Sequence, residues 1–156
     1  MPSRDAFSAM VGSGSVGVST FVSWMTANPA SVATGTGQAL PGYYVQQCTG
    51  STVIPCGIAQ MGSRYAPTDE NSSNLAAAGS YLGNAGQVGD PIAVYGLGAQ
   101  GVQLQIGPAV TAGQLLMANA SGQGIPATSG GWYGAEAQES GTAGALIRVQ
   151  VKQGKY

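Results

Sequence analysis

The sequence contains no histidine, two cysteines and few charged residues. Only 7% of its residues are charged, whereas folded domains average about 25%. Without histidine, Ser-His-Asp and Cys-His nucleophilic sites are excluded, and zinc loses one of its main ligands. Cys48 and Cys56 are too few to hold a metal. They would stand at unequal distances from a turn at residues 49–51, so we expect free buried thiols rather than a disulfide.

The few charges also limit the partners that the protein can bind. The chain has a net charge of -1, and its five basic residues are Arg4, Arg64, Arg148, Lys152 and Lys155. Apart from a small C-terminal cluster they are scattered, so we expect no nucleic-acid binding. No apolar run reaches the roughly 18 residues that span a bilayer, so we expect no membrane partner. The N-terminus does not fit a secretory signal, because Gly and Ser interrupt its apolar stretch.

Two patterns look like reactive sites but lack the required context. "GSGSVG" (residues 12–17) matches G-x-G-x-x-G, yet no acidic residue stands between it and Asp69, as a dinucleotide site would need. Asp69 and Glu70 are adjacent, so on a strand they would point in opposite directions. Glu136 and Glu139 straddle a strand end and a turn, where carboxylates are usually solvated. We therefore predict a non-enzymatic protein with no catalytic residues, no cofactor and no metal.

Glycine and proline dominate in place of charge. The 26 glycines and 8 prolines, with 44% apolar residues, favour a single all-β domain with many tight turns. From residue 43 onward strand signals become regular. In "VQLQI" (102–106) and "ALIRVQV" (145–151) apolar and polar residues alternate. The apolar faces are predicted to consist of Val102, Leu104 and Ile106, and of Ile147, Val149 and Val151.

One sequence pattern occurs twice in the chain. "TGSTVIPCGIAQ" (49–60) returns in expanded form as "SGQGIPATSGGWYGAEAQ" (121–138). The predicted strands on either side also match. "YYVQQ" (43–47) aligns with "QLLMANA" (114–120), and "PIAVYG" (91–96) aligns with "ALIRVQV" (145–151). The last connection of the first copy is longer and contains residues 64–88. Two similar antiparallel units would close on each other as a jelly-roll-like β-sandwich or barrel. The alternative is that strands rich in Gly and Ala resemble one another through composition alone.

Residues 1–40 show no clean period and are interpreted as an N-terminal arm or outer layer, with the β-domain at 41–156. Large aromatic side chains are the remaining candidates for contact with other chains. In the arm, "FVSWM" suggests an anchor onto a neighbour. Trp132 and Tyr133 follow a flexible Gly-Gly turn, which favours core or subunit-interface packing over a sugar-stacking platform. The predicted interface residues are Phe21, Trp24, Met25, Trp132 and Tyr133.

A series of short motifs runs through the second half of the chain. These are "GD" (89–90), "VTAGQLL" (110–116), "ASG" (120–122), "PAT" (126–128), "GAE" (134–136) and "AGALIRVQV" (143–151). Together with "YYVQQCTGSTVIPCGIAQ" (43–60), they resemble the capsid decoration, or cement, proteins of tailed bacteriophages. Residues 1–40 and 64–88 depart from that pattern. The resemblance implies a virion protein on the exterior of the head, assembled in the host cytoplasm.

The resemblance also implies a partner. Such proteins bind the major capsid protein where several subunits meet, and they stabilise the contacts between those subunits. Symmetric sites favour symmetric oligomers, so we expect a homo-oligomer, with a trimer preferred over a dimer. The alternative function is a tail-tip or surface module that recognises a receptor or carbohydrate through Trp132, Tyr133 and the 64–88 loop.

Overall fold

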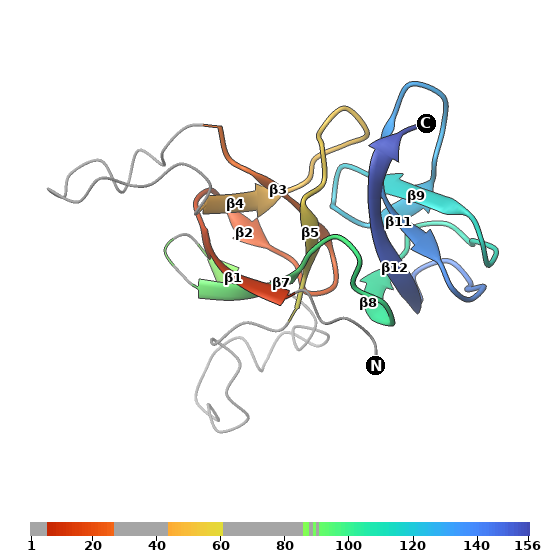
Figure 1. Ribbon diagram of the computed structural model, residues 1–156, viewed down its shortest axis with the longest axis horizontal. Helices are drawn as coiled ribbons and strands as arrows, with labels where there is room; N and C mark the ends of the chain where they lie inside the picture. The colour runs from red at the N-terminus through yellow and green to blue at the C-terminus, as the bar shows by residue number, and fades with distance from the viewer. Residues whose placement is uncertain (1–5, 27–43, 61–85, 88, 90) are drawn as a thin grey trace, which may run out of the picture.

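A computed structural model describes residues 6–26, 44–60, 86–87, 89 and 91–156, and every regular element in these ranges is a β-strand (Figure 1). The all-β class is thus confirmed. In chain order the strands are β1 (Ala6–Val11), β2 (Ser15–Val16), β3 (Phe21–Trp24), β4 (Tyr44–Gln47), β5 (Gly57–Ala59), β6 (Gly86–Gln87), β7 (Pro91–Tyr95), β8 (Val102–Gln105), β9 (Leu115–Ala118), β10 (Gly124–Pro126), β11 (Trp132–Ala137) and β12 (Leu146–Lys155).

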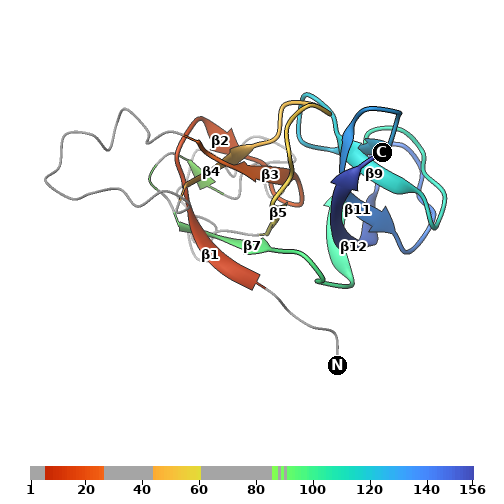
Figure 2. The same ribbon diagram turned by 45° about the horizontal axis from the view of Figure 1, so that its top comes forward.

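The strands form two main units that lie side by side (Figures 1 and 2). In the first, called here the N-terminal barrel, the order β1-β4-β3-β5-β7 closes on itself. The second, called the C-terminal sheet, has the order β10-β9-β11-β12-β8. Its two edge strands meet at a parallel bridge between Ile106 and Gly124. The sequence pattern predicted two units that close on each other, whereas here the N-terminal barrel closes on itself and the C-terminal unit is a separate five-stranded sheet.

Both units follow one plan of strand pairing. The counterparts are β1 and β8, β3 and β9, β4 and β10, β5 and β11, and β7 and β12. The register repeats as well. Gln60 N donates to Ala93 O at 2.9 Å in the barrel, and Gln138 N donates to Arg148 O at 2.9 Å in the sheet. The repeated hydrogen bonds support a duplicated unit over a chance likeness of composition, because composition does not set register.

The duplication differs in detail from the one predicted. The alignments of β5 with β11 and of β7 with β12 agree with the sequence pattern. "YYVQQ", however, contains β4, whose counterpart is β10, whereas β9 in "QLLMANA" corresponds to β3. Each unit also contains one parallel contact, so the units are not purely antiparallel. The strand order is that of two tandem units, and it gives no support to a jelly roll in particular.

The N-terminal segment is part of the barrel rather than an arm, as far as it is described. β1 and β3 are two of the five barrel strands, and β2 pairs with β6. The prediction of an arm at 1–40 was therefore wrong for residues 6–26. Its cause is visible in β3, where Phe21, Val22 and Ser23 are all buried. A strand covered on both faces shows no alternation. Residues 27–40, and all of 64–88 except Gly86–Gln87, lie outside the described residues.

Two apolar cores hold the molecule together. The first fills the N-terminal barrel and consists of Ala9, Val11, Val16, Val18, Val22, Val45, Ala59, Ile92 and Val94. The second fills the C-terminal sheet, and it includes both predicted apolar faces of β8 and β12. It also takes in Phe21, Cys48 and Ile58 from the outer face of the barrel, so one core is shared between the two units.

Phe21 is the centre of the junction between the units. A Cβ placed on Gly134 would lie 2.7 Å from Phe21 Cε1 and 2.8 Å from Pro55 Cβ, so only glycine leaves room for the ring. The backbone joins at the same place, because Phe21 N donates to Gly122 O at 2.8 Å. Nearby, Trp132 N donates to Ser51 O at 2.8 Å. The two units therefore pack as one body.

We expect Gly134→Ala to destabilise the fold by about 1–3 kcal/mol, because the added methyl group overlaps Phe21 and Pro55. Urea unfolding measures this change. Ala109→Ser, at an exposed turn position, is the control and should stay within about 0.5 kcal/mol of the parent. Equal stability of both variants would show that the junction is looser than described.

Candidate functional site

The described acidic side chains are each matched to a basic one, and they do not form a catalytic pair. Glu136 accepts from Lys152 Nζ, and Glu139 forms a separate ion pair with Arg148. Within the described ranges no group of three His, Cys, Asp or Glu residues could hold a metal ion. This part of the chain therefore presents no assembled acid–base or metal site.

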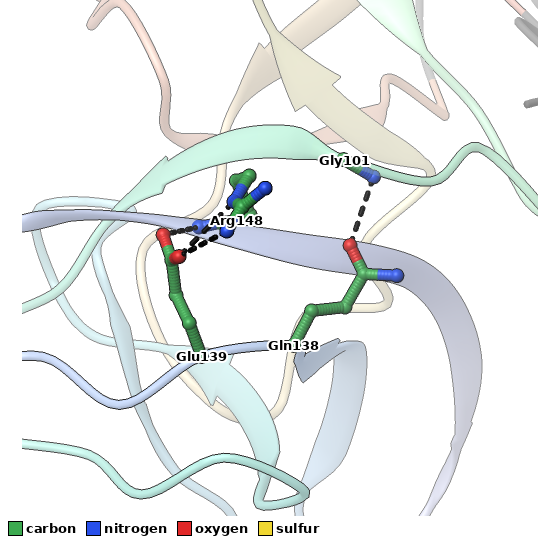
Figure 3. Close-up of polar contacts among 4 residues, drawn as sticks. All are labelled: Gly101, Gln138, Glu139 and Arg148. Atoms are coloured by element: carbon green, nitrogen blue, oxygen red, sulfur yellow. Dashed lines mark hydrogen bonds and ion pairs between the residues drawn. The ribbon is translucent and has the colours of Figure 1, made fainter.

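Glu139 and Arg148 form a forked contact on the surface of the C-terminal sheet (Figure 3). Glu139 Oε2 accepts from Arg148 Nε at 3.0 Å and from Nη2 at 2.9 Å, while Oε1 accepts from the Arg148 backbone N at 2.8 Å. These donors, the guanidinium first, lower the pKa of the Glu139 carboxyl. Beside it, Gln138 Oε1 accepts from Gly101 N at 2.9 Å. The group ties β12 to the turns around it, which is a structural role.

The carboxyl pKa of Glu139 should lie below that of an ordinary glutamate, about 4.3, and should rise toward it in Arg148→Met. Because the folded-state pKa is lowered, the pair stabilises the fold above the unfolded pKa, and this contribution is lost as pH falls through the folded value. Carbon-13 NMR titration of both proteins measures the shift. An identical Glu139 pKa in parent and variant would mean that the ion pair does not form in solution.

Both cysteines are free thiols, as predicted, but only Cys48 is buried and Cys56 is half-buried. Burial raises the pKa of Cys48 to about 12, and burial together with the nearby Cys48 raises that of Cys56 to about 12. The thiolate is the reactive form of cysteine. The raised pKa values favour the protonated thiols at neutral pH, which disfavours nucleophilic reactivity at these positions.

The buried Cys48 thiol, measured in Cys56→Ser, should therefore react with a thiol reagent at pH 8 orders of magnitude more slowly in the folded protein than in denaturant. An exposed cysteine introduced by Ala109→Cys provides the control and should react at once under native conditions. Rapid native labelling of Cys56→Ser would contradict the burial described here.

Phe21, Trp24 and Met25 were predicted together as an anchor, and the structure separates them. Phe21 is fully buried at the junction, so it is not available to another chain. Met25 is half-buried, and its backbone N donates to Tyr44 O at 2.9 Å. Trp24 is 41% exposed, and its ring stacks on Phe7 with centroids 5.1 Å apart. Of the three, only Trp24 presents a large side chain at the surface.

Trp132 and Tyr133 lie at the start of β11 and are both half-buried. The Tyr133 ring covers Gly154 on β12 so closely that a Cβ there would overlap it. Trp132 is paired with Lys155 across the same two strands. Packing within the chain thus accounts for much of the burial of Tyr133, and a role of either residue in a subunit interface stays a prediction.

A groove lined in part by Trp24 lies at one end of the N-terminal barrel, and we call it the Trp24 groove. None of the described residues that line it is charged. Its first part has a volume of about 470 Å³ and is lined by Ala6, Phe7, Trp24, Cys56, Gly96 and Leu97. Past Trp24 and Cys56 it continues into a second part of about 370 Å³, lined also by Ser23, Thr26, Gln46, Val53, Ile54 and Gln153. Trp24, Ile54 and Leu97 are the exposed large apolar residues along it.

Sequence reasoning singled out Trp24 but missed its neighbours. Leu97 is 51% exposed and Ile54 is 46% exposed, and both stand in irregular segments next to strands. An isolated apolar residue in a turn carries no periodicity, so no pattern distinguishes it from a core residue.

Comparison with solved structures shows that the fold has a precedent. The chain is similar to the N base of the head fiber protein gp8.5 of bacteriophage phi29, with a TM-score of 0.54 and 16% sequence identity. The similarity covers 97% of this chain and 96% of that chain. No protein-family model matches the sequence, and comparison with curated proteins finds no match. In the described residues no helix is long and apolar enough to cross a membrane.

Proposed function

We propose that the protein is a non-enzymatic structural component of a bacteriophage virion, bound to the outer surface of the capsid, where it stabilises contacts between major capsid subunits. The observation that carries the proposal is the similarity to a phage head fiber base, which extends over 97% of this chain. A likeness of this extent includes both the N-terminal barrel and the C-terminal sheet. It agrees with the decoration-protein motifs in the second half of the sequence.

The surface chemistry supports a role in binding. The charged residues described are few, and none of them lines the Trp24 groove. The N-terminal barrel is closed and offers no free edge for strand addition, so a partner would contact this unit through side chains and turns. A protein that binds the assembled shell and not the free subunits stabilises the shell by mass action. Such a role requires no reacting group.

A homo-oligomer, with a trimer preferred over a dimer, is part of the proposal. Capsid lattices present symmetric sites, and symmetric sites are matched most simply by symmetric oligomers. The exterior position on the capsid and assembly in the host cytoplasm are also part of the proposal, and they are supported by the resemblance of the sequence motifs to capsid decoration proteins.

A second candidate is a receptor- or carbohydrate-binding module of the virion surface. It is favoured by one observation, the exposed Trp24 ring beside the amide side chains of Gln46 and Gln153. Aromatic faces with nearby amides are suited to stacking on sugars. A glycan array with purified protein separates the two candidates, because the capsid role predicts no specific glycan.

Particle composition and stability test the proposal directly. Purified virions should contain the chain in a fixed ratio to the major capsid protein. Particles produced without it should release DNA at a lower temperature, and purified protein added back should restore the parent value. Only a few copies at the tail, with unchanged thermal release, would favour the receptor-binding candidate and contradict the structural role.

A further inference from the structure

β12 is longer than the strand that covers its second edge. It spans Leu146–Lys155, and β11 pairs with it as far as Lys155. On the other side, β8 pairs only with Leu146–Val149, and the turn after β7 adds backbone bonds to Val151. In Figure 1, β8 lies beside the end of β12 that is far from the C-terminus. Residues 153–155 therefore extend past β8, and we call their β8 side the β12 edge.

The backbone groups of Gln153 and Lys155 face this side. In an antiparallel sheet, successive residues of a strand direct their N–H and C=O groups to opposite edges. Val151 bonds to the β8 side, where its N donates to Ala99 O at 2.8 Å. Tyr156 bonds to the β11 side, where its N donates at 2.8 Å to the residue that precedes β11. Both references place the groups of Gln153 and Lys155 on the β8 side, where no described residue pairs with them.

The β12 edge is held in strand form from its other sides. β11 pairs with Gly154 and Lys155, and the Tyr133 ring covers Gly154. Gln153 Nε2 donates to Pro55 O at 2.7 Å, which ties the strand to the segment before β5. A partner strand would not have to order this edge, so binding would lose less conformational entropy.

The N-terminal barrel shows what covers the equivalent strand. β7 is the counterpart of β12, and Pro91–Tyr95, its whole length, pair with β1. β8, the counterpart of β1, reaches less than half of β12. The rest of β12 continues in strand form, with N–H and C=O groups at the spacing of a ladder. Such a row of groups is matched by another extended backbone.

We propose that the β12 edge binds an extended segment of another protein by β-strand addition, and that this segment carries a carboxylate beside Lys155. The described basic residues all lie on β12, and Arg148 and Lys152 are each paired with a glutamate. Lys155 is exposed and has no carboxylate partner among the described residues. An acidic group on the added strand would supply the missing counter-charge.

The β12 edge of a second copy is a poor occupant. Two such edges paired antiparallel would bring two Lys155 ammonium groups onto one short ladder without a counter-charge, and like charges on paired strands are destabilising. Lysine at a strand edge is a common guard against pairing between like chains. The N-terminal barrel of a second copy is closed, so it has no strand edge to pair. The observations therefore favour a different protein as the partner.

The inference rests on the proposed function only for identifying the partner as a virion protein. Strand addition itself can be tested on the purified chain. If the edge binds its probe but virions lack the chain, only the proposed function fails. If virions contain the chain but the edge binds nothing, only the present inference fails.

The probe is the capped peptide Thr-Val-Glu-Val-Thr, which favours an extended backbone and carries one carboxylate. Hydrogen exchange of the backbone amides, followed by nitrogen-15 NMR, detects its addition. In the chain alone, the amides of Gln153 and Lys155 should exchange fast, while those of Val151 and Tyr156 are protected by their hydrogen bonds. Saturating peptide should slow exchange at Gln153 and Lys155.

A control peptide separates strand addition from other modes of binding. The same peptide with N-methyl groups on its three central residues keeps its side chains and charge but cannot donate to the ladder. It should bind at least about tenfold more weakly, because the backbone hydrogen bonds are lost.

Two variants of the chain test the charge. Lys155→Gln should weaken binding of the Glu peptide about two- to fivefold, as expected for an exposed ion pair. Arg148→Gln is the matched control, since it removes the same charge from the part of β12 that β8 covers, and it should not change binding. Lys155→Glu should reverse the preference, so that a peptide with Lys in place of Glu binds more tightly than the Glu peptide.

Several outcomes would overturn the inference. Slow exchange of Gln153 and Lys155 in the chain alone would mean that the chain covers this edge itself. Protection that grows with protein concentration in the absence of peptide would make a second copy the occupant. Equal binding of the two Glu peptides would exclude strand addition, and equal effects of Lys155→Gln and Arg148→Gln would exclude the carboxylate contact.

Discussion

The fold depends on the packing of β3 between the two units. One face of this strand contributes Val22 to the barrel core, while the other places Phe21 in the core shared with the C-terminal sheet. Burial of a phenylalanine side chain contributes about 1.5–3 kcal/mol, and here it also fixes the position of one unit against the other. Gly134 makes this approach possible because it has no side chain. A chain with so few charges has apolar packing and backbone hydrogen bonds as its main sources of cohesion.

The two units share one strand plan but differ in their side chains. Their pairing registers agree, and one clear difference lies on the outer face. On the counterpart strands, Ile58 of the barrel is replaced by Glu136 in the sheet. At this position the outer face of the barrel is apolar and is covered by the C-terminal sheet. The outer face of the sheet is polar there and is partly exposed to water. The asymmetry leaves one apolar end, around Trp24, without a partner in the described structure.

Part of this arrangement could be predicted from the sequence. Strands β8 and β12 alternate because one face is buried and the other exposed, and Leu104 and Val149 are buried as expected. The repeated Ala-Gln ending of β5 and β11 identified the duplication because the same hydrogen bonds recur there. The N-terminal strands could not be identified, since β3 is buried on both faces and has no alternation. The Trp24 groove was also missed, because Leu97 reaches it from a turn whose position only tertiary packing decides.

Because the proposed role is contact with the capsid rather than a chemical reaction, the place of the chain on the particle is the decisive observation. A reconstruction of the virion by electron microscopy provides it. We expect density for the two tandem units on the outside of the head, at junctions between major capsid subunits. Density confined to the tail, or a head with no trace of the chain, would contradict the account.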